Sequence, residues 1–212
     1  MQLFFLHTVN LINTHRKSLT YALGGIVLVL IAWYSYREYR MSQIQQASIA
    51  YYHLTHASNT DLYAHQKFVD HHPNTIFTVF SWMKMAQIYH EKHDFDKADE
   101  SLQHATKLVS DPGLKSLLQL RMAKVALSAG KPQRAIDLLH SIHGSYLQNS
   151  RAMTESDALS KLHQYDQAYS LLLDLEKNIR AELSDKPSQE IFTFSQIIAA
   201  KKNQLQSFLP SY

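Results

Sequence analysis

The sequence predicts an all-α protein, in which a single N-terminal transmembrane helix is followed by a solenoid of stacked helix pairs. Only 5 Gly and 5 Pro occur among 212 residues, a composition that suits long helices better than strands joined by tight turns. A stretch of 19 residues near the N-terminus carries no charge. The chain after it repeats one pattern of large and small side chains.

Charge and cysteine content exclude several classes of function. The first 40 residues hold four of the 21 Lys and Arg and one of the 18 Asp and Glu, so the remaining chain carries 17 of each and is neutral. Domains that bind nucleic acid show a clustered positive face, so we expect no nucleic-acid partner. The chain has no Cys, which excludes disulfides, a Cys nucleophile and the lipid-bearing Cys of a bacterial lipoprotein.

The uncharged stretch is residues 18–36, with a continuously apolar centre at residues 26–31. As a helix it would reach about 28 Å, close to the roughly 30 Å hydrocarbon core of a bilayer. Aromatic residues gather at its C-terminal end and basic residues flank both ends, as at membrane interfaces. We therefore predict a transmembrane helix at residues 18–36.

A cleaved secretory signal is the rival interpretation of this stretch. Cleavage requires small residues after the apolar run, whereas Trp33, Tyr34 and Tyr36 are bulky and Arg37 is charged. We expect an uncleaved anchor instead. The positive charges on the two sides of this stretch are nearly balanced, so they do not decide its orientation. We expect the short N-terminus inside and the body outside, because the large polar domain follows the helix.

The chain after the anchor fits the tetratricopeptide type of helix-pair repeat, which is about 34 residues long. Counting from residue 79, large residues stand at positions 4, 7, 11 and 24 and small ones at 8, 20 and 27, namely Trp82, Met85, Tyr89, Leu102, Ala86, Ala98 and Ala105. Small side chains let the two helices of a unit approach closely. We expect the turn between the two helices of this unit at residues 93–96, with Asp94 or Asp96 capping the second helix.

The pattern returns 37 residues later and, more weakly, after another 33. The second unit has Met122, Ala123, Ala126, Ala135, Leu139 and Ile142, and the third has Ser156, Leu159, Ala168, Leu172 and Leu175. Gln119 at position 4 of the second unit and Glu155 at position 7 of the third depart from it. Turns are expected at residues 129–132 and 163–166.

A helix pair at residues 43–57 and 61–71 and a capping helix at residues 188–208 complete the predicted solenoid, since about three units with atypical ends are needed for stability. The predicted organisation is a cytoplasmic tail (1–17), the transmembrane helix (18–36), a linker and first helix pair (37–75), the repeats (76–180) and the capping helix (181–212).

The inner face of such a solenoid is lined by positions 2, 5, 9, 12 and 13 of the first helix of each unit. From these positions we predict a protein-binding groove with Phe80, Met83, Gln87, Leu117, Leu120, Lys124, Leu127, Met153 and Asp157. Apolar side chains exposed there would mark a protein-binding site. The alternative is that the first helix pair or the C-terminal helix covers the groove.

No catalytic or metal-binding pattern stands out. The chain has no glycine-rich loop before a helix and no serine in a strained turn with partners. The pairs His90/His93 and His140/His143 are three residues apart, but a zinc site needs about four ligands, and both pairs fall at predicted helix ends. We expect exposed histidines, no metal, no cofactor, no small-molecule substrate and no enzymatic activity.

Several segments resemble the YfgM-like ancillary SecYEG translocon subunit family. They are residues 46–51, 67–68, 73–75, 120–125 and 202–205. The resemblance covers nearly the whole chain after Leu19, although the N-terminal tail is shorter and less acidic than in that family.

This resemblance implies a bacterial inner-membrane protein with a cytoplasmic N-terminus and a periplasmic repeat domain. It also implies two partners, the SecYEG translocon and a PpiD-like periplasmic chaperone, and a role in export or early folding of secreted and outer-membrane proteins. The alternative is a structural envelope scaffold that organises a cell-wall or pilus assembly machine. Such proteins often carry a lipidated Cys or a cleaved signal, so the absence of both counts against it.

Overall fold

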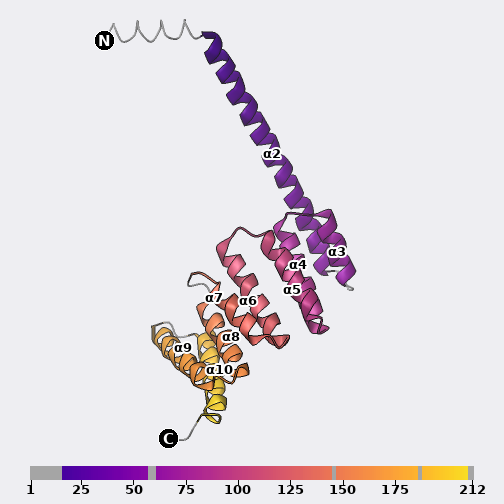
Figure 1. Ribbon diagram of the computed structural model, residues 1–212. Coiled ribbons are helices and arrows are strands. Elements are labelled where there is room, and N and C mark those ends of the chain that lie inside the picture. The colour runs from indigo at the N-terminus through magenta and orange to yellow at the C-terminus, as the bar shows by residue number, and fades with distance from the viewer. Residues whose placement is uncertain (1–15, 57–60, 145–146, 186–187, 210–212) are drawn as a thin grey trace, which may run out of the picture. The chain divides into compact units, whose positions relative to one another are not determined.

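The computed structural model describes residues 16–56, 61–144, 147–185 and 188–209, without the side chains of residues 16–19, 22 and 23. Over these residues the regular structure is entirely α-helical (Figure 1), which confirms the predicted all-α class. The chain divides into two compact units, Met1–His53 and Leu54–Tyr212.

Most of the first unit is one long helix, α2 (Arg16–His56), drawn in indigo in Figure 1. A linker was expected after residue 36, but α2 continues through it without a break. The reason is local: no Gly or Pro occurs between Gly25 and the end of α2 at His56, so no helix-breaking residue interrupts the helix there. The first helix of the predicted pair at 43–57 is therefore the C-terminal part of α2.

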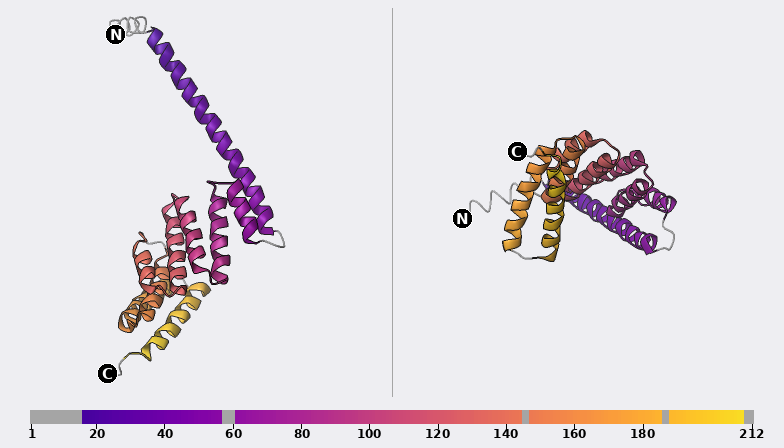
Figure 2. Two further views of the ribbon diagram at one scale, coloured as in Figure 1. Left: turned by 45° about the vertical axis from the view of Figure 1, so that its right-hand side comes forward. Right: turned by 90° about the horizontal axis from the view of Figure 1, so that it is seen from below.

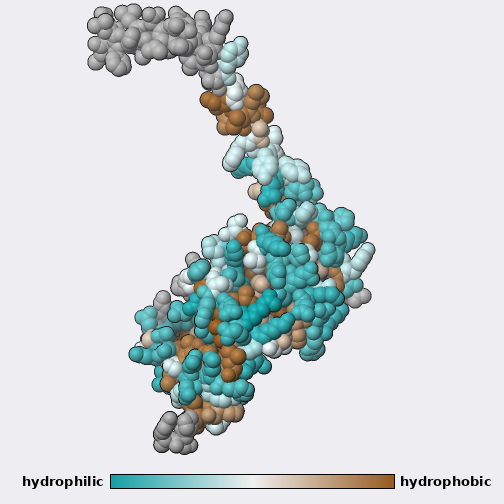
Figure 3. All heavy atoms as spheres, in the orientation of Figure 1, coloured by the Kyte–Doolittle hydropathy of each residue, from teal (hydrophilic) through white to brown (hydrophobic). Residues whose placement is uncertain are grey.

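The apolar centre of α2 is exposed. Side chains of residues 26–31 are between 50% and 69% exposed, and they form a brown band on the long helix in Figure 3. Over the described residues, no helix is both long enough and apolar enough to cross a membrane. Four members of the predicted span, Ser18, Leu19, Ala22 and Leu23, have side chains outside the described residues, as does most of the predicted tail 1–17.

The second unit is a series of antiparallel helices, each packed on the next (Figure 2). In chain order they are α3 (Leu62–His71), α4 (Ile76–Glu91), α5 (Phe95–Lys107), α6 (Pro112–Ser128), α7 (Pro132–His140), α8 (Gln148–Lys161), α9 (Tyr165–Asp185) and α10 (Gln189–Gln206). The three predicted repeats are the pairs α4–α5, α6–α7 and α8–α9. Helix α6 also packs on α8, as the first helices of successive units do in a solenoid. Because α9 runs to Asp185, the boundary expected at residue 181 falls inside a helix.

The turn inside each repeat has the same backbone geometry. His93, Gly130 and His163 all stand at position 15 and have left-handed φ values of 59°, 70° and 60°. The next residue then donates its N–H to the carbonyl five residues back, at 2.9 Å in all three units, which satisfies an open carbonyl at the helix end. The predicted cap is confirmed too, since the side chain of Asp94 accepts from the Lys97 N–H at 3.3 Å.

Small residues at positions 8 and 20 form the centre of each helix pair. All six, Ala86, Ala98, Ala123, Ala135, Ser156 and Ala168, are at most 3% exposed. Larger side chains fill the space around them in two core clusters. One joins α4, α5 and α6, and the other extends from α6 to α10 and includes Ile198 and Leu205.

Hydrogen bonds explain the two departures from the repeat pattern. Gln119 donates its side-chain amide to the Ser141 hydroxyl at 2.9 Å. In the first unit Trp82, at the same position 4, stacks on His104 with ring centroids 4.7 Å apart. Glu155 bonds to the Nε2 atom of His140 at 2.9 Å and so connects α8 to α7. At both positions a polar contact between helices replaces apolar packing.

Candidate protein-binding groove

Two pockets open beside α6, on the face that carries the predicted groove positions. The first pocket, of about 180 Å³, is lined by Met83, Ala86, Gln87, His90, Leu102, Arg121, Lys124 and Val125. The second pocket, of about 630 Å³, is lined by Lys124, Leu127, Ser128, Thr154, Ser156, Asp157, Ser160, Lys161, Tyr165, Lys201, Gln204, Leu205 and Phe208. Lys124 lines both, so the two pockets are neighbours along one face.

The first pocket has an apolar floor and a polar rim. Its floor includes Ala86 and Leu102, which are at most 3% exposed. On the rim, Gln87 is exposed and donates its side-chain amide to Glu91 at 2.8 Å. The Nε2 atom of His90 bonds to the Ser128 hydroxyl at 2.9 Å, which joins α4 to α6. Arg121 and Lys124 of α6 also line the pocket and are exposed. This arrangement suits an apolar side chain flanked by polar or negatively charged acceptor groups.

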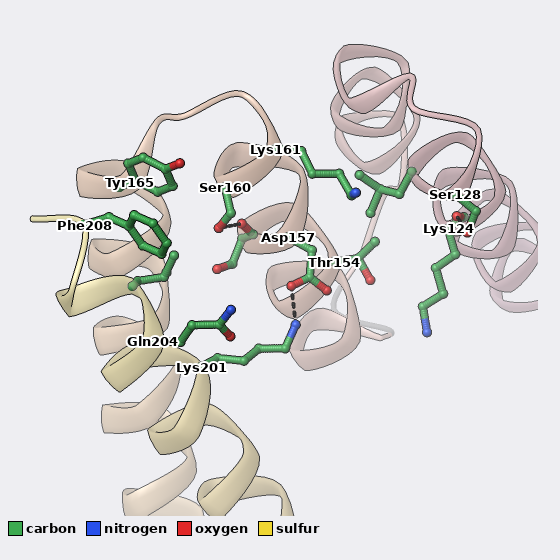
Figure 4. A pocket seen from close by; sticks show the side chains of 13 residues that line it. Lys124, Ser128, Thr154, Asp157, Ser160, Lys161, Tyr165, Lys201, Gln204 and Phe208 are labelled. Carbon is green, nitrogen blue, oxygen red and sulfur yellow. Dashed lines mark hydrogen bonds and ion pairs between the residues drawn. The ribbon is translucent and has the colours of Figure 1, made fainter.

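The second pocket has helix α10 as one wall (Figure 4). From this wall Lys201 donates to the carboxylate of Asp157 on α8. Phe208, just beyond the end of α10, stacks on Tyr165 at the start of α9, with centroids 4.8 Å apart and rings inclined by 14°. The C-terminal helix thus supplies both charged and aromatic groups to the pocket.

Helix α10 is held in place by apolar and ionic contacts. Ile198 is fully buried and Leu205 is 7% exposed. Glu176 of α9 accepts from Lys202 at 2.5 Å and from Arg180 at 2.7 Å. The bond from Lys202, and then that from Arg180, lowers the pKa of Glu176 against the opposing effect of burial. The wall of the second pocket is therefore fixed to the repeat by charge as well as by packing.

The predicted groove residues fall into three groups. Met83, Gln87 and Lys124 line the first pocket, and Lys124, Leu127 and Asp157 line the second. Leu120 and Leu127 are only 4% and 9% exposed and belong to the core cluster that includes α10. The others, Phe80, Leu117 and Met153, line neither pocket, and Phe80 is 36% exposed. The groove is partly open and partly occupied by the C-terminal helix.

Sequence reasoning missed the α10 side of the second pocket. Lys201, Gln204 and Phe208 belong to a segment that was predicted to cap the solenoid or, in the alternative, to cover the groove, but not to line a pocket. A signal was present, since Lys201 stands on the same helical stripe as Ile198 and Leu205. A charge on an otherwise apolar stripe indicates a partner of opposite charge on the surface to which the helix docks.

One histidine of each predicted pair makes a contact between helices. His90 bonds to Ser128 and His140 to Glu155, so neither ring is directed to its pair partner. His93 occupies the left-handed turn position. In the part of the chain that the structure describes, no cluster of three or more His, Asp or Glu could hold a metal ion.

Comparison with known proteins gives one family and two similar curated relatives. The family described as "Tetratricopeptide repeat-like domain" matches residues 12–172. The protein named "Ancillary SecYEG translocon subunit" from Haemophilus influenzae is 26% identical over 132 residues, which cover 60% of this chain and 65% of the relative. The protein of that name from Escherichia coli K12 is 28% identical over 127 residues, covering 57% and 61%.

These relatives confirm the resemblance seen in the sequence. The match spans less than two thirds of the length of each relative. The relatives' name is therefore a statement about those proteins and not about this chain.

Proposed function

The chain belongs to the tetratricopeptide repeat-like domain family, and we propose that it is a non-enzymatic, protein-binding scaffold of the bacterial Sec export machinery. The observation that carries the proposal is the pair of pockets beside α6, on the face where solenoids of this type present their groove. The name shared by the two relatives, ancillary SecYEG translocon subunit, supports SecYEG as the partner.

Residues 18–36 are proposed to anchor the chain in the bacterial inner membrane. They carry no charge, and the apolar side chains at residues 26–31 are exposed on a continuous helix. Removing such a side chain from water is worth roughly 1.5–3 kcal/mol, so six together strongly favour a bilayer. Trp33 and Tyr34 stand where aromatic side chains prefer the membrane interface.

The proposed orientation places the N-terminus in the cytoplasm and the repeats in the periplasm. There the groove can meet exported chains and a PpiD-like periplasmic chaperone during export or early folding. The family resemblance supports this arrangement, and so does the size of the polar unit that follows the helix. Protease added to spheroplasts should degrade the repeats, while intact cells should protect them. Protection in both would contradict the orientation.

Co-purification tests the partner. We expect the full chain, tagged at its C-terminus and extracted from membranes in mild detergent, to retain SecYEG and the PpiD-like chaperone. A chain with Leu28→Lys and Leu30→Lys should fail to reach the membrane and should lose SecYEG while its repeats stay folded. Recovery of the intact chain without either partner would contradict the proposal.

A further inference from the structure

The second pocket carries positive charge that the protein does not neutralise. Three lysines from three helices line it, Lys124 from α6, Lys161 from α8 and Lys201 from α10. Asp157 is the one acid among the lining residues, and Lys201 donates to it. Within the described residues, the ammonium groups of Lys124 and Lys161 have no acidic partner, and both side chains are exposed. Figure 4 shows these two lysines on different walls of the pocket.

Three of the hydroxyl groups that line the pocket already donate their hydrogens to backbone carbonyl oxygens. Thr154 and Ser160 each donate to the backbone carbonyl four residues back at 2.7 Å, and Ser128 does so at 3.1 Å. A hydroxyl has one hydrogen to give, so these groups can only accept further bonds. The lysine and amide donors left for a ligand are the ammonium groups of Lys124 and Lys161, the amide of Gln204 and the ammonium hydrogens of Lys201 that Asp157 does not accept. These donors favour a ligand rich in negatively charged acceptors.

An aromatic wall stands beside these charges. Phe208 stacks on Tyr165 and still leaves 55% of its surface exposed. The volume of about 630 Å³ lies within the range of ligand-binding pockets, about 300–1,000 Å³. That space holds a few residues of extended chain rather than a folded domain. A matching ligand therefore combines carboxylates with an apolar side chain.

We propose that the second pocket binds an acidic, extended segment of a partner protein. Its Asp or Glu side chains contact Lys124 and Lys161, and a neighbouring apolar side chain packs against Tyr165 and Phe208. The inference rests on the proposed scaffold function and specifies the chemistry of the segment that the scaffold binds. An anionic membrane surface fits less well, because such contacts use clusters of 4–8 exposed basic residues, whereas the two free lysines here line a pocket.

Peptide binding to the full chain in detergent micelles tests this chemistry. The probe is a fluorescent hexapeptide, Leu-Glu-Phe-Glu-Leu-Glu, acetylated at its N-terminus and amidated at its C-terminus, and its anisotropy reports binding. An exposed ion pair contributes roughly 0.2–1 kcal/mol. The double variant K124Q/K161Q should therefore weaken binding about tenfold, and added salt should weaken it further. A peptide with Gln in place of Glu should lose a similar factor.

The matched control is K107Q/K115Q, which removes two exposed lysines of α5 and α6 outside both pockets. It should bind the acidic peptide as the wild type does, and circular dichroism should show both double variants fully helical. Equal binding by K124Q/K161Q and the wild type would overturn the proposal. So would binding seen only with a second version of the peptide that keeps its free C-terminal carboxylate. Binding of phosphatidylglycerol vesicles that K124Q/K161Q abolishes, with no binding of the peptide, would also overturn it.

Failure of this inference is distinguishable from failure of the proposed function. If SecYEG co-purifies with the wild-type chain but the acidic peptide does not bind, the pocket chemistry is wrong and the scaffold role stands. If the peptide binds through Lys124 and Lys161 but SecYEG is not retained, the pocket chemistry stands and the assigned machinery is wrong.

Discussion

The two pockets beside α6 are built from the same repeat positions, yet they differ in size and in the elements that form their walls. Position 9 contributes Gln87 and Lys124 to the first pocket and Lys124 and Asp157 to the second. Only the second has a wall from outside the repeats, and that wall brings Lys201 to Asp157. We infer that the capping helix, rather than the repeat pattern, determines what the C-terminal half of the groove can bind.

The largest expected effect comes from loosening that wall. Ile198 is fully buried between α10 and the repeats, so Ile198→Ala should leave a cavity and lower the free energy of unfolding by about 2–4 kcal/mol. Ile197 is the matched control, since it is 47% exposed on the same helix, and Ile197→Ala should cost under about 0.5 kcal/mol. Urea unfolding followed by circular dichroism measures both. Equal losses would show that α10 is not docked through this face.

The ionic attachment of α10 should contribute less. Glu176→Gln weakens the bonds from Lys202 and Arg180 and should lower stability by about 1–2 kcal/mol at pH 7. The folded-state pKa of Glu176 is lowered, chiefly by Lys202. Its contribution is therefore full above the unfolded pKa of about 4.5 and is lost as pH falls through the folded pKa.

Unfolding measured between pH 7 and 3 tests this second effect. The wild type should lose stability more steeply than the Glu176→Gln variant below pH 4.5. Parallel pH profiles for the two proteins would show that the carboxylate does not hold α10.

The left-handed turn position holds Gly in one unit and His in another, so substitutions there should change stability in opposite directions. Gly130→Ala places a side chain at φ 70° and should destabilise the chain by about 1 kcal/mol, although no neighbouring atom lies within 4 Å of the added methyl group. His163→Gly relieves a left-handed conformation at φ 60°, worth a few tenths to about 1 kcal/mol, and this gain should outweigh the loss of the exposed hydrogen bond between His163 Nδ1 and the Tyr165 hydroxyl at 2.8 Å. Thermal unfolding of both variants measures the pair, and shifts of the same sign would contradict the shared turn geometry.

The smallest expected effect concerns the charge balance of the second pocket. Asp157→Asn frees Lys201 from its carboxylate partner and should tighten binding of the acidic hexapeptide about two- to fivefold. The same assay with Gln87→Ala, in the first pocket, should show no change. A loss of affinity in Asp157→Asn would mean that Asp157 positions Lys201 for the ligand rather than competing with it.

The repeat units were predictable because close helix packing requires small residues at fixed positions. Ala98, Ala135 and Ala168 are fully buried at one such position, and their spacing is visible in the sequence. The segment after residue 36, where a linker was expected, is part of the continuous helix α2, because the end of an apolar run marks a change of surroundings and does not by itself end a helix.

Tertiary contacts account for what the sequence did not reveal. Glu155 and Gln119 depart from the pattern, and their partners His140 and Ser141 lie at the C-terminal end of α7 and just beyond it. The docking of α10 depends on Ile198 meeting a surface that the repeats form only after folding. Groove residues could be assigned to a face from periodicity, but whether that face is open depends on this docking.

The central claim is that proteins bind on the pocket face beside α6. A photoreactive residue in place of Gln87, on the rim of the first pocket, tests it in the membrane-embedded full chain. The control is Gln133, an exposed residue of α7 outside both pockets. We expect crosslinks from residue 87 to SecYEG, a periplasmic chaperone or exported chains, and few from residue 133. Equal crosslinking from both sites, or only intramolecular products from residue 87, would contradict it.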